Sequence, residues 1–129
     1  MPQRQRISTE DAPAAIGPYS QAIRTGDLLF CSGQIPLEPS TGELVKDEIE
    51  GQARRCLQNL AAVAEAAGGS LANAVRCTVY LTDMNDFARV NEVYAEFFGD
   101  DDPPARVAVA AAALPKGADV EIDAIVVLG

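Results

Sequence analysis

The chain has 129 residues, of which 48% are hydrophobic and 22% are charged, the balance of an ordinary globular protein. This length suits one domain with its own core, so we expect a single domain over residues 1–129. The net charge of −9 argues against sequence-independent binding to nucleic acid, because Lys and Arg contacts to phosphates supply most of that affinity. A small anionic ligand stays compatible with this charge, since an ion pair inside a cleft is screened less than distant surface charges.

The N-terminus and the cysteine and histidine content limit the expected cellular location of the protein and the kinds of catalytic site that it can contain. The N-terminus lacks the apolar core of a signal peptide, and no run of residues is long and apolar enough to cross a bilayer, so we expect a cytosolic protein. An odd number of cysteines in apolar segments favours buried thiols over disulfides: Cys31, Cys56 and Cys77. The absence of histidine excludes Ser-His and Cys-His nucleophile pairs and His-containing metal sites.

The N-terminal part predicts a short extended piece and a loop over residues 7–17, followed by two strands over residues 19–25 and 28–32. Gly26-Asp27 supplies the hairpin turn between these strands. The unbroken apolar character of the second strand suggests that it is covered on both faces. At its end, Gly33 either presents its backbone N–H to a close neighbour or simply terminates the strand.

Two amphipathic helices are predicted around a third strand. Apolar residues at helical spacing indicate a helix over residues 47–67, which Gly68-Gly69 ends. Alternation predicts a strand over residues 75–81, with Val75 on its more buried face, and a second helix follows over residues 83–98. Asn91 falls within the apolar stripe of this second helix. A buried amide must be hydrogen-bonded, so Asn91 either ties down a neighbouring loop, which we favour, or touches a ligand.

The C-terminal part predicts an aspartate-rich loop and two last strands over residues 106–112 and 120–128. The aspartates of residues 99–104 lack the ordered ligand spacing of a calcium loop, so we treat them as solvated charge. Two helices would cover only one face of the resulting sheet, and the other face keeps few polar positions. This indicates self-association through that face, to which we assign Val107, Val109, Ile122, Ala124, Ile125, Val126 and Val127.

Arg106 is the only charged residue between Pro104 and Lys116. A guanidinium at the edge of an apolar wall is costly unless an anion or several acceptors meet it, and its planar fork suits a carboxylate. Glu121 is the first acidic residue on the following strand apart from the flanking Asp119. Either Arg106 and Glu121 form a structural ion pair, or both serve a ligand.

Separated blocks of this sequence resemble the RidA family of reactive-intermediate deaminases, also called YjgF. The resemblance covers nearly the whole chain. It rests on EDAPAAIGPY at residues 10–19, SGQIP at 32–36, Asn85-Asp86-Phe87 with Val90-Asn91, and Pro104-Ala105-Arg106 followed by Leu114-Pro115-Lys116 and Val120-Glu121-Ile122.

The resemblance implies an α+β, chorismate-mutase-like fold with a mixed sheet of about six strands and two helices packed on one face. The other face would be buried in a homotrimer with clefts between the subunits. The implied activity is hydrolysis of enamines and imines, such as 2-aminoacrylate or 2-iminobutyrate, to 2-keto acids and ammonia. No metal, cofactor, nucleic acid or membrane partner is expected.

Site residues are carried over by position. Arg106 would hold the substrate carboxylate, and Glu121 would position and activate water. Substrate contacts are expected from Tyr19, Ser32, Gly33, Asn91 and Ala108. Many family members carry a cysteine at the position of Ala108, so only backbone contacts would survive there, and we expect substrate range and rate to change more than reaction class.

Two other functions are compatible with the same residues. A trimer that binds or senses a small carboxylate such as a keto acid, without turnover, would use Arg106 in the same way. It would leave imine decay at its spontaneous rate. A chaperone-like or RNA-cleaving role gets little support from the acidic charge and the lack of histidine.

Overall fold

The computed structural model describes residues 3–129, which form six strands, two α-helices and three short 3₁₀ helices. No helix of this part is long and apolar enough to cross a membrane. The elements in chain order are β1 (Gln5–Ile7), β2 (Ala22–Thr25), β3 (Leu28–Gln34), α1 (Ile49–Ala66), η1 (Leu71–Asn73), β4 (Ala74–Leu81), η2 (Met84–Asp86), α2 (Phe87–Phe98), β5 (Ala105–Ala110), η3 (Pro115–Gly117) and β6 (Val120–Val127).

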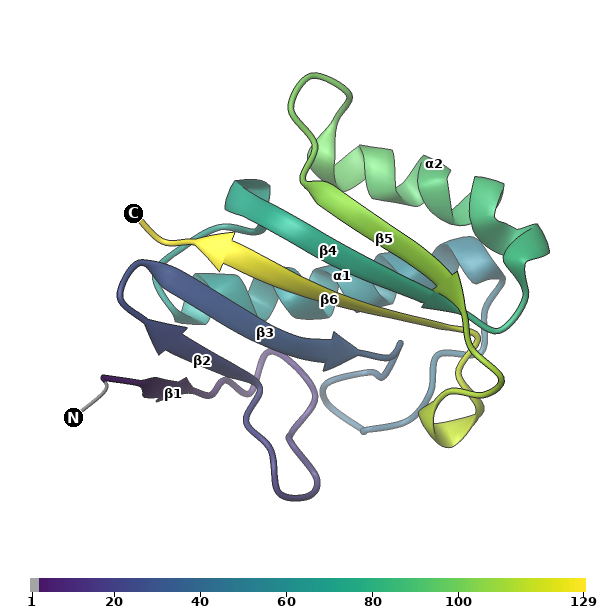
Figure 1. Ribbon diagram of the computed structural model, residues 1–129. Helices are drawn as coiled ribbons and strands as arrows, with labels where there is room; N and C mark the ends of the chain where they lie inside the picture. The colour runs from purple at the N-terminus through teal and green to yellow at the C-terminus, as the bar shows by residue number, and fades with distance from the viewer. Residues whose placement is uncertain (1–2) are drawn as a thin grey trace.

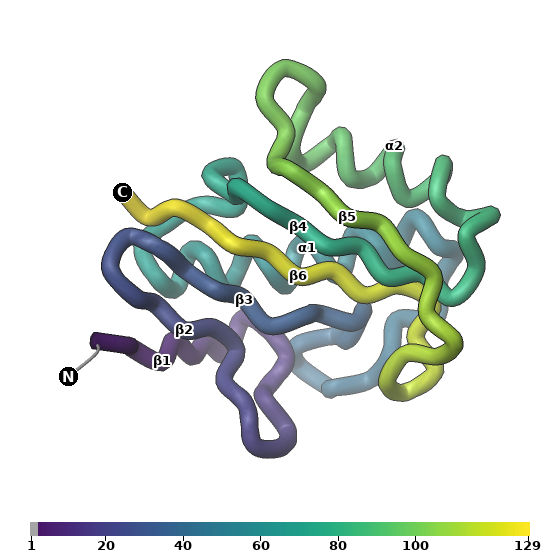
Figure 2. The backbone as a smooth tube through the Cα atoms, in the orientation of Figure 1, coloured from purple at the N-terminus to yellow at the C-terminus, as the bar shows by residue number. Residues whose placement is uncertain are grey.

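The strands form one sheet in the order β1-β2-β3-β6-β4-β5, with β1 and β5 at its edges. The β4–β5 pair is parallel and every other pair is antiparallel. Helix α1 crosses behind the sheet and packs beside α2, as the ribbon shows (Figure 1), and the tube view follows the chain through β6 in the middle of the sheet (Figure 2). The predicted α+β class, the mixed six-stranded sheet and the two helices are confirmed.

Strand β6 separates the two faces of the sheet. Its even-numbered side chains from Val120 to Val126 are buried towards the helices, whereas the odd-numbered ones from Glu121 to Val127 are only partly covered. This is the two-residue period of a strand with one face against the core. Helix α1 contributes Leu57, Leu60 and Val63 to that core, each with no exposed surface. Each such side chain stabilises the fold by about 1.5–3 kcal/mol.

The face opposite the helices is apolar and uncovered within one chain, and we call it the open face. Phe30, Val107 and Val109 lie on it with 43%, 37% and 39% of their surfaces exposed. The prediction that the second strand is covered on both faces is therefore wrong for a single chain. The assignment of Ile122, Ala124 and Val126 to this face is also wrong, because they are the buried residues of β6. Self-association through the open face stays a prediction.

Strand β2, predicted to start at residue 19, begins at Ala22, and Gln21 explains why. Its buried amide accepts a hydrogen bond from Thr9 N at 2.7 Å and donates to Thr9 O at 3.0 Å and Pro13 O at 2.8 Å. These bonds bind the N-terminal loop to the body and leave Tyr19 in the loop. Strand β1 lies before this loop, over Gln5–Ile7, so it meets the predicted extended piece of residues 7–17 only at Ile7.

Local hydrogen bonds and one bulge shift other predicted boundaries. The second helix starts as the 3₁₀ helix η2, whose N-cap Asp83 accepts from Asn85 N at 2.9 Å, and becomes α-helical only at Phe87. A register shift between Ala74 and Arg76 gives Ala74 the buried place, so Val75 is 45% exposed, contrary to the prediction. The first helix is shorter than predicted by two residues at its start and one at its end.

The three cysteines are free and buried, as predicted. Burial raises the pKa of Cys31 to about 12 and that of Cys77 to about 11, and it raises the pKa of Cys56 as well. Because the thiolate is the reactive form, these side chains act as packing groups and not as nucleophiles.

Asn59 fixes the segment that follows β3. Its side chain has no exposed surface, its Nδ2 donates to Leu37 O at 3.0 Å, and its Oδ1 accepts from Arg55 Nε at 3.1 Å. Leu37 lies just beyond the SGQIP block, so helix α1 holds the end of this block in place through one buried amide.

We predict that Asn59→Ala lowers the free energy of unfolding by about 1–3 kcal/mol, because it leaves the Leu37 carbonyl without its buried donor. Urea denaturation followed by circular dichroism measures the change. Gln58→Ala is the matched control, since Gln58 is the exposed neighbour on the same helix. Equal midpoints for the Asn59 and Gln58 variants would contradict this role.

Candidate functional site

A cleft of about 530 Å³ lies where the end of β3 meets the start of β6. The loop before β2 and the 3₁₀ helix η3 form its other walls. Four of the predicted site residues share this cleft: Tyr19, Ser32, Gly33 and Glu121. The remaining lining residues are Pro13, Ala14, Ile16, Gln21, Gln34, Ile35, Leu37, Pro115 and Lys116.

Gly33 and Glu121 are packed directly against each other. A Cβ built on Gly33 would lie 3.0 Å from Glu121 Cδ and 3.2 Å from its Cγ, and closer still to Oε2. Only glycine lets the β3 backbone approach the carboxylate this closely. The β3–β6 register also shifts between Cys31 and Gln34, so Ser32 and Gly33 stand outside the regular pairing. The structure thus gives Gly33 a close-contact role beyond that of a strand terminator.

Ser32 attaches the loop that carries Tyr19 to the strand. Its Oγ donates to Ser20 O at 2.5 Å, and its backbone N donates to Gln21 O at 2.9 Å. The Ser32 hydroxyl oxygen can still accept a hydrogen bond, because its own proton is the group donated to Ser20. Tyr19, with 53% of its surface exposed, stands at the rim.

The surroundings of the Glu121 carboxyl group disfavour its ionised form. Burial raises its pKa above the usual value, and the negative charge of Asp123 on the same face raises it further. Asp123 itself accepts from Thr78 N at 2.9 Å and from Tyr80 Oη at 3.3 Å, which fixes its position. Among residues 3–129, the ion pairs join Arg54, Arg55 and Arg89 to other carboxylates, so Glu121 has no compensating cation.

Arg106 lies elsewhere, against helix α2. Its Nη1 donates to Asn91 Oδ1 at 2.6 Å, and its Cζ lies 4.8 Å from the ring centroid of Tyr94 and 5.2 Å from that of Phe87. Asn91 therefore holds the guanidinium, and the preference for a loop as its partner was wrong. Ala108 lies two residues along β5 and is partly buried beside the core.

Strand register places Arg106 and Glu121 on opposite faces of the sheet. Arg106 on β5 pairs with Cys77 on β4, and Glu121 on β6 pairs with Tyr80 on the same β4 strand. Residues three apart on a strand point to opposite faces. The two predicted catalytic residues are thus two strands apart and on opposite faces, and they do not form an ion pair within one chain. The predicted site divides into a Glu121 group and an Arg106 group.

Lys116 is a cleft residue that the sequence analysis did not select. It is the only non-glycine residue of the described chain with a positive φ, at 59°, and Gly117 follows it with φ 74°. Its Nζ lies 3.4 Å from Gly42 O, so it joins the cleft rim to the loop before α1. The residue lay within a recognised sequence block, but its type and spacing gave no indication of where it points.

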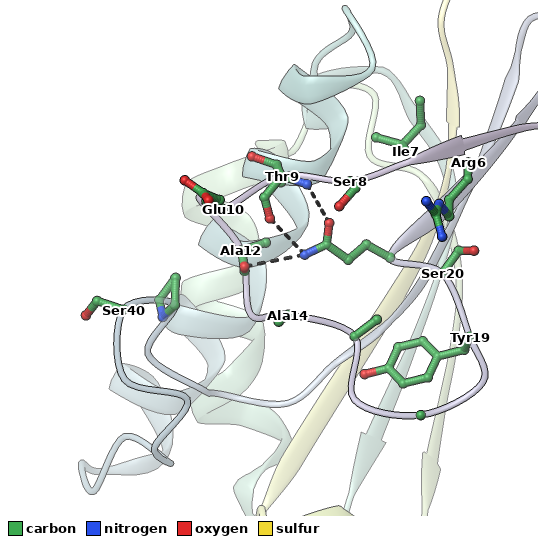
Figure 3. A pocket seen from close by; sticks show the side chains of 14 residues that line it. Arg6, Ile7, Ser8, Thr9, Glu10, Ala12, Ala14, Tyr19, Ser20 and Ser40 are labelled. Carbon is green, nitrogen blue, oxygen red and sulfur yellow. Dashed lines mark hydrogen bonds between the residues drawn. The ribbon is translucent and has the colours of Figure 1, made fainter.

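A second cavity of about 780 Å³ shares Tyr19 and Gln21 with the cleft and is lined mainly by residues that precede β2 (Figure 3). Its lining includes the charged residues Arg6 and Glu10, and the amide-bearing Gln21 is also among the lining residues. That amide is already occupied by the backbone of Thr9 and Pro13. The polar groups in this second cavity hold the loop together. The cleft at Glu121, in contrast, contains a carboxyl group whose pKa is raised. The Glu121 cleft is the better candidate site.

No group of three or more His, Cys, Asp or Glu side chains within residues 3–129 is placed to hold a metal ion. The polar side chains that line the cleft are those of Tyr19, Gln21, Ser32, Gln34, Lys116 and Glu121.

We predict that Glu121→Gln stabilises the protein at neutral pH and not at acid pH. A raised pKa means that the folded chain binds the proton more tightly than the unfolded chain, so wild-type stability falls as pH rises through that pKa. The melting temperature is measured between about pH 4, near the ordinary pKa of Glu, and pH 7.5. The difference in melting temperature between Glu121→Gln and wild type should grow in favour of the variant as the pH rises. Glu92→Gln, at an exposed position of α2, is the control. If the melting temperatures of Glu121→Gln and wild type differ by the same amount at every pH, the raised pKa of Glu121 is contradicted.

Comparisons with known proteins identify the family to which this chain belongs. Residues 9–128 match the family model described as Endoribonuclease L-PSP. A RutC family protein from Pyrococcus horikoshii is 57% identical over 95% of this chain and 96% of its own length. The 2-iminobutanoate/2-iminopropanoate deaminase of Mus musculus is 49% identical over 98% of this chain and 93% of its own. The crystal structure of E. coli TdcF with bound serine superposes with a TM-score of 0.90 at 46% identity, covering 95% of this chain and 98% of the other. The chain therefore belongs to the Endoribonuclease L-PSP family, the YjgF/RidA family that its sequence blocks resemble.

Proposed function

We propose that this protein hydrolyses carboxylate-bearing enamines and imines, such as 2-aminoacrylate and 2-iminobutyrate, to 2-keto acids and ammonia. One observation carries the proposal. Within residues 3–129, neither Glu121 nor Arg106 has an ion-pair partner, so one carboxyl and one guanidinium stay available to a ligand. The name of the mouse relative and the serine bound to TdcF support the same substrate class, because both involve small amino- or imino-carboxylates.

The reaction needs little from the protein. The imine carbon is electrophilic once its nitrogen is protonated, and adding a proton to the carbon of an enamine gives the same iminium. Water attacks that carbon as Glu121 takes one of the water protons, which leaves a neutral carbinolamine. Glu121 then returns this proton to the nitrogen. The C–N bond breaks with its electron pair leaving on ammonia, while the hydroxyl oxygen forms the C=O bond of the keto acid and gives its own proton to the departing ammonia. A carboxyl whose pKa is raised towards neutrality suits both proton transfers.

We propose further that the site is completed in a homotrimer, with Arg106 of one copy facing the Glu121 cleft of the next. Strand β5 is a sheet edge and Arg106 is exposed, so a neighbouring copy can reach it. The apolar open face beside it, with Phe30, Val107 and Val109, gives the association a driving force. Closing the cleft would also remove more water from Glu121 and raise its pKa further.

Within that shared site, Arg106 would bind the substrate carboxylate through two parallel N–H donors, while Asn91 fixes the remaining nitrogen. The Gly33 backbone and Ser32 would orient the reacting end next to Glu121, with Tyr19 covering it. Ala108 offers only its backbone and a methyl group. We therefore expect this chain to differ from relatives with a cysteine at that position in rate and substrate range.

The experiment couples an enzyme that releases 2-aminoacrylate or 2-iminobutyrate to this protein and follows keto-acid formation. We expect acceleration above spontaneous hydrolysis, reduced by about 100-fold or more in Glu121→Ala, as is usual for loss of an acid–base group. Arg106→Ala should be similarly impaired, mainly through substrate binding. Arg89→Ala and Glu96→Ala, on the outer helix surface, are the matched controls. Wild-type protein that binds the keto acid but leaves the spontaneous rate unchanged would instead identify a carboxylate-binding protein.

A further inference from the structure

Helix α2 presents three neutral side chains to the Arg106 guanidinium. Phe87, Asn91 and Tyr94 are spaced at i, i+4 and i+7 and therefore lie on one face of the helix. The two ring centroids lie 5.2 Å and 4.8 Å from Arg106 Cζ, and the amide oxygen lies 2.6 Å from Nη1. We call these three residues the α2 cradle.

The cradle differs from the surroundings of the other arginines near the helices. Arg54 lies 2.8 Å from Glu96, Arg89 lies 2.6 Å from Glu50, and Arg55 lies 3.8 Å from Glu38. These arginines meet carboxylates, whereas Arg106 meets two rings and an amide. Aromatic faces attract a cation without neutralising it and without accepting its N–H groups strongly. Arg106 thus has no carboxylate partner among residues 3–129 and keeps most of its donors while its position is fixed.

We propose that Phe87 and Tyr94 are positioning residues that hold the Arg106 guanidinium ready for a carboxylate. This inference rests on the proposed role of Arg106 as the carboxylate anchor. An arginine side chain that is free to rotate must be ordered when the ligand binds, and the ordering weakens binding. The cradle removes that step, because the guanidinium is already held from the helix side.

The ring of Tyr94, and not its hydroxyl, carries the contact. Tyr94 is 6% exposed, and its Oη has no hydrogen-bond partner within the described residues. The ring of Phe98 packs against that of Tyr94 with centroids 4.6 Å apart, which fixes Tyr94 from a second direction. The conservative change Tyr94→Phe should therefore preserve the cradle, whereas Tyr94→Leu should not.

The test measures binding of 2-ketobutyrate by calorimetry, together with kcat and KM for the imine. We expect Phe87→Leu to weaken keto-acid binding and raise KM by about two- to tenfold, the range for ordering one long side chain, with a smaller change in kcat. Tyr94→Phe should keep wild-type binding. Phe97→Leu is the matched control, an equal substitution on the same helix at a ring without an Arg106 contact.

A double-mutant cycle decides between positioning and a general effect on stability. In an Arg106→Ala background, Phe87→Leu should have no further effect on binding, because the group that it positions is gone. Equal binding by wild-type protein and Phe87→Leu, or an undiminished loss in the Arg106→Ala background, would overturn the proposal.

A separate readout keeps this inference distinct from the proposed function. The Arg106 side-chain protons over two rings should be shifted by ring currents in the NMR spectrum of the free protein, and Phe87→Leu should reduce the shift. If the wild-type protein neither binds the keto acid nor accelerates hydrolysis, the proposed function fails and the positioning role fails with it, although the ring-current shift would still report the cradle. Normal activity without any such shift would overturn the cradle alone.

Discussion

Side chains along a β-strand point alternately to the two faces of the sheet, and the candidate site depends on this constraint. On β6 it turns Glu121 towards the open face because Val120 and Ile122 must enter the core. On β5 it turns Arg106 towards α2, since Arg106 pairs with the buried Cys77. A one-residue slip would reverse either side chain and would expose part of the core. The same burial that stabilises the fold therefore keeps the guanidinium and the carboxyl apart within one chain.

Among the residues that the structure describes, neither Glu121 nor Arg106 has an ion-pair partner, whereas Arg54, Arg55 and Arg89 pair with carboxylates. Burial and Asp123 raise the pKa of Glu121, while two aromatic rings and an amide hold Arg106. A direct pair would have lowered the pKa of Glu121 and occupied the donors of Arg106. Under the proposed function, the two separated groups would serve opposite ends of one substrate, a carboxylate at Arg106 and an electrophilic imine carbon near Glu121. The apolar open face would then have a role, because association would bring the two groups together.

The sequence predicted the elements better than it predicted their contacts. Apolar spacing identified both helices, and alternation identified the strand at residues 75–81, because both signals are local. The start of β2 was misplaced because the Gln21 amide bonds to residues about ten positions away. The faces of the last strands were misassigned because an apolar run does not reveal which side meets the helices. Arg106 and Glu121 were selected from their chemistry and the family resemblance, whereas the partner of Asn91 and the place of Lys116 depend on tertiary packing that no local pattern encodes.

Mixed subunits test most directly whether the site is shared between copies. Arg106→Ala and Glu121→Ala chains are unfolded together in equal amounts, refolded and assayed for keto-acid formation, with separately refolded chains mixed afterwards as the control. If each site takes Arg106 from one copy and Glu121 from the next, about a quarter of the sites regain both residues by random assembly, and activity returns to about that fraction of wild type. If co-refolded chains assemble and stay as inactive as either variant alone, the shared site is wrong.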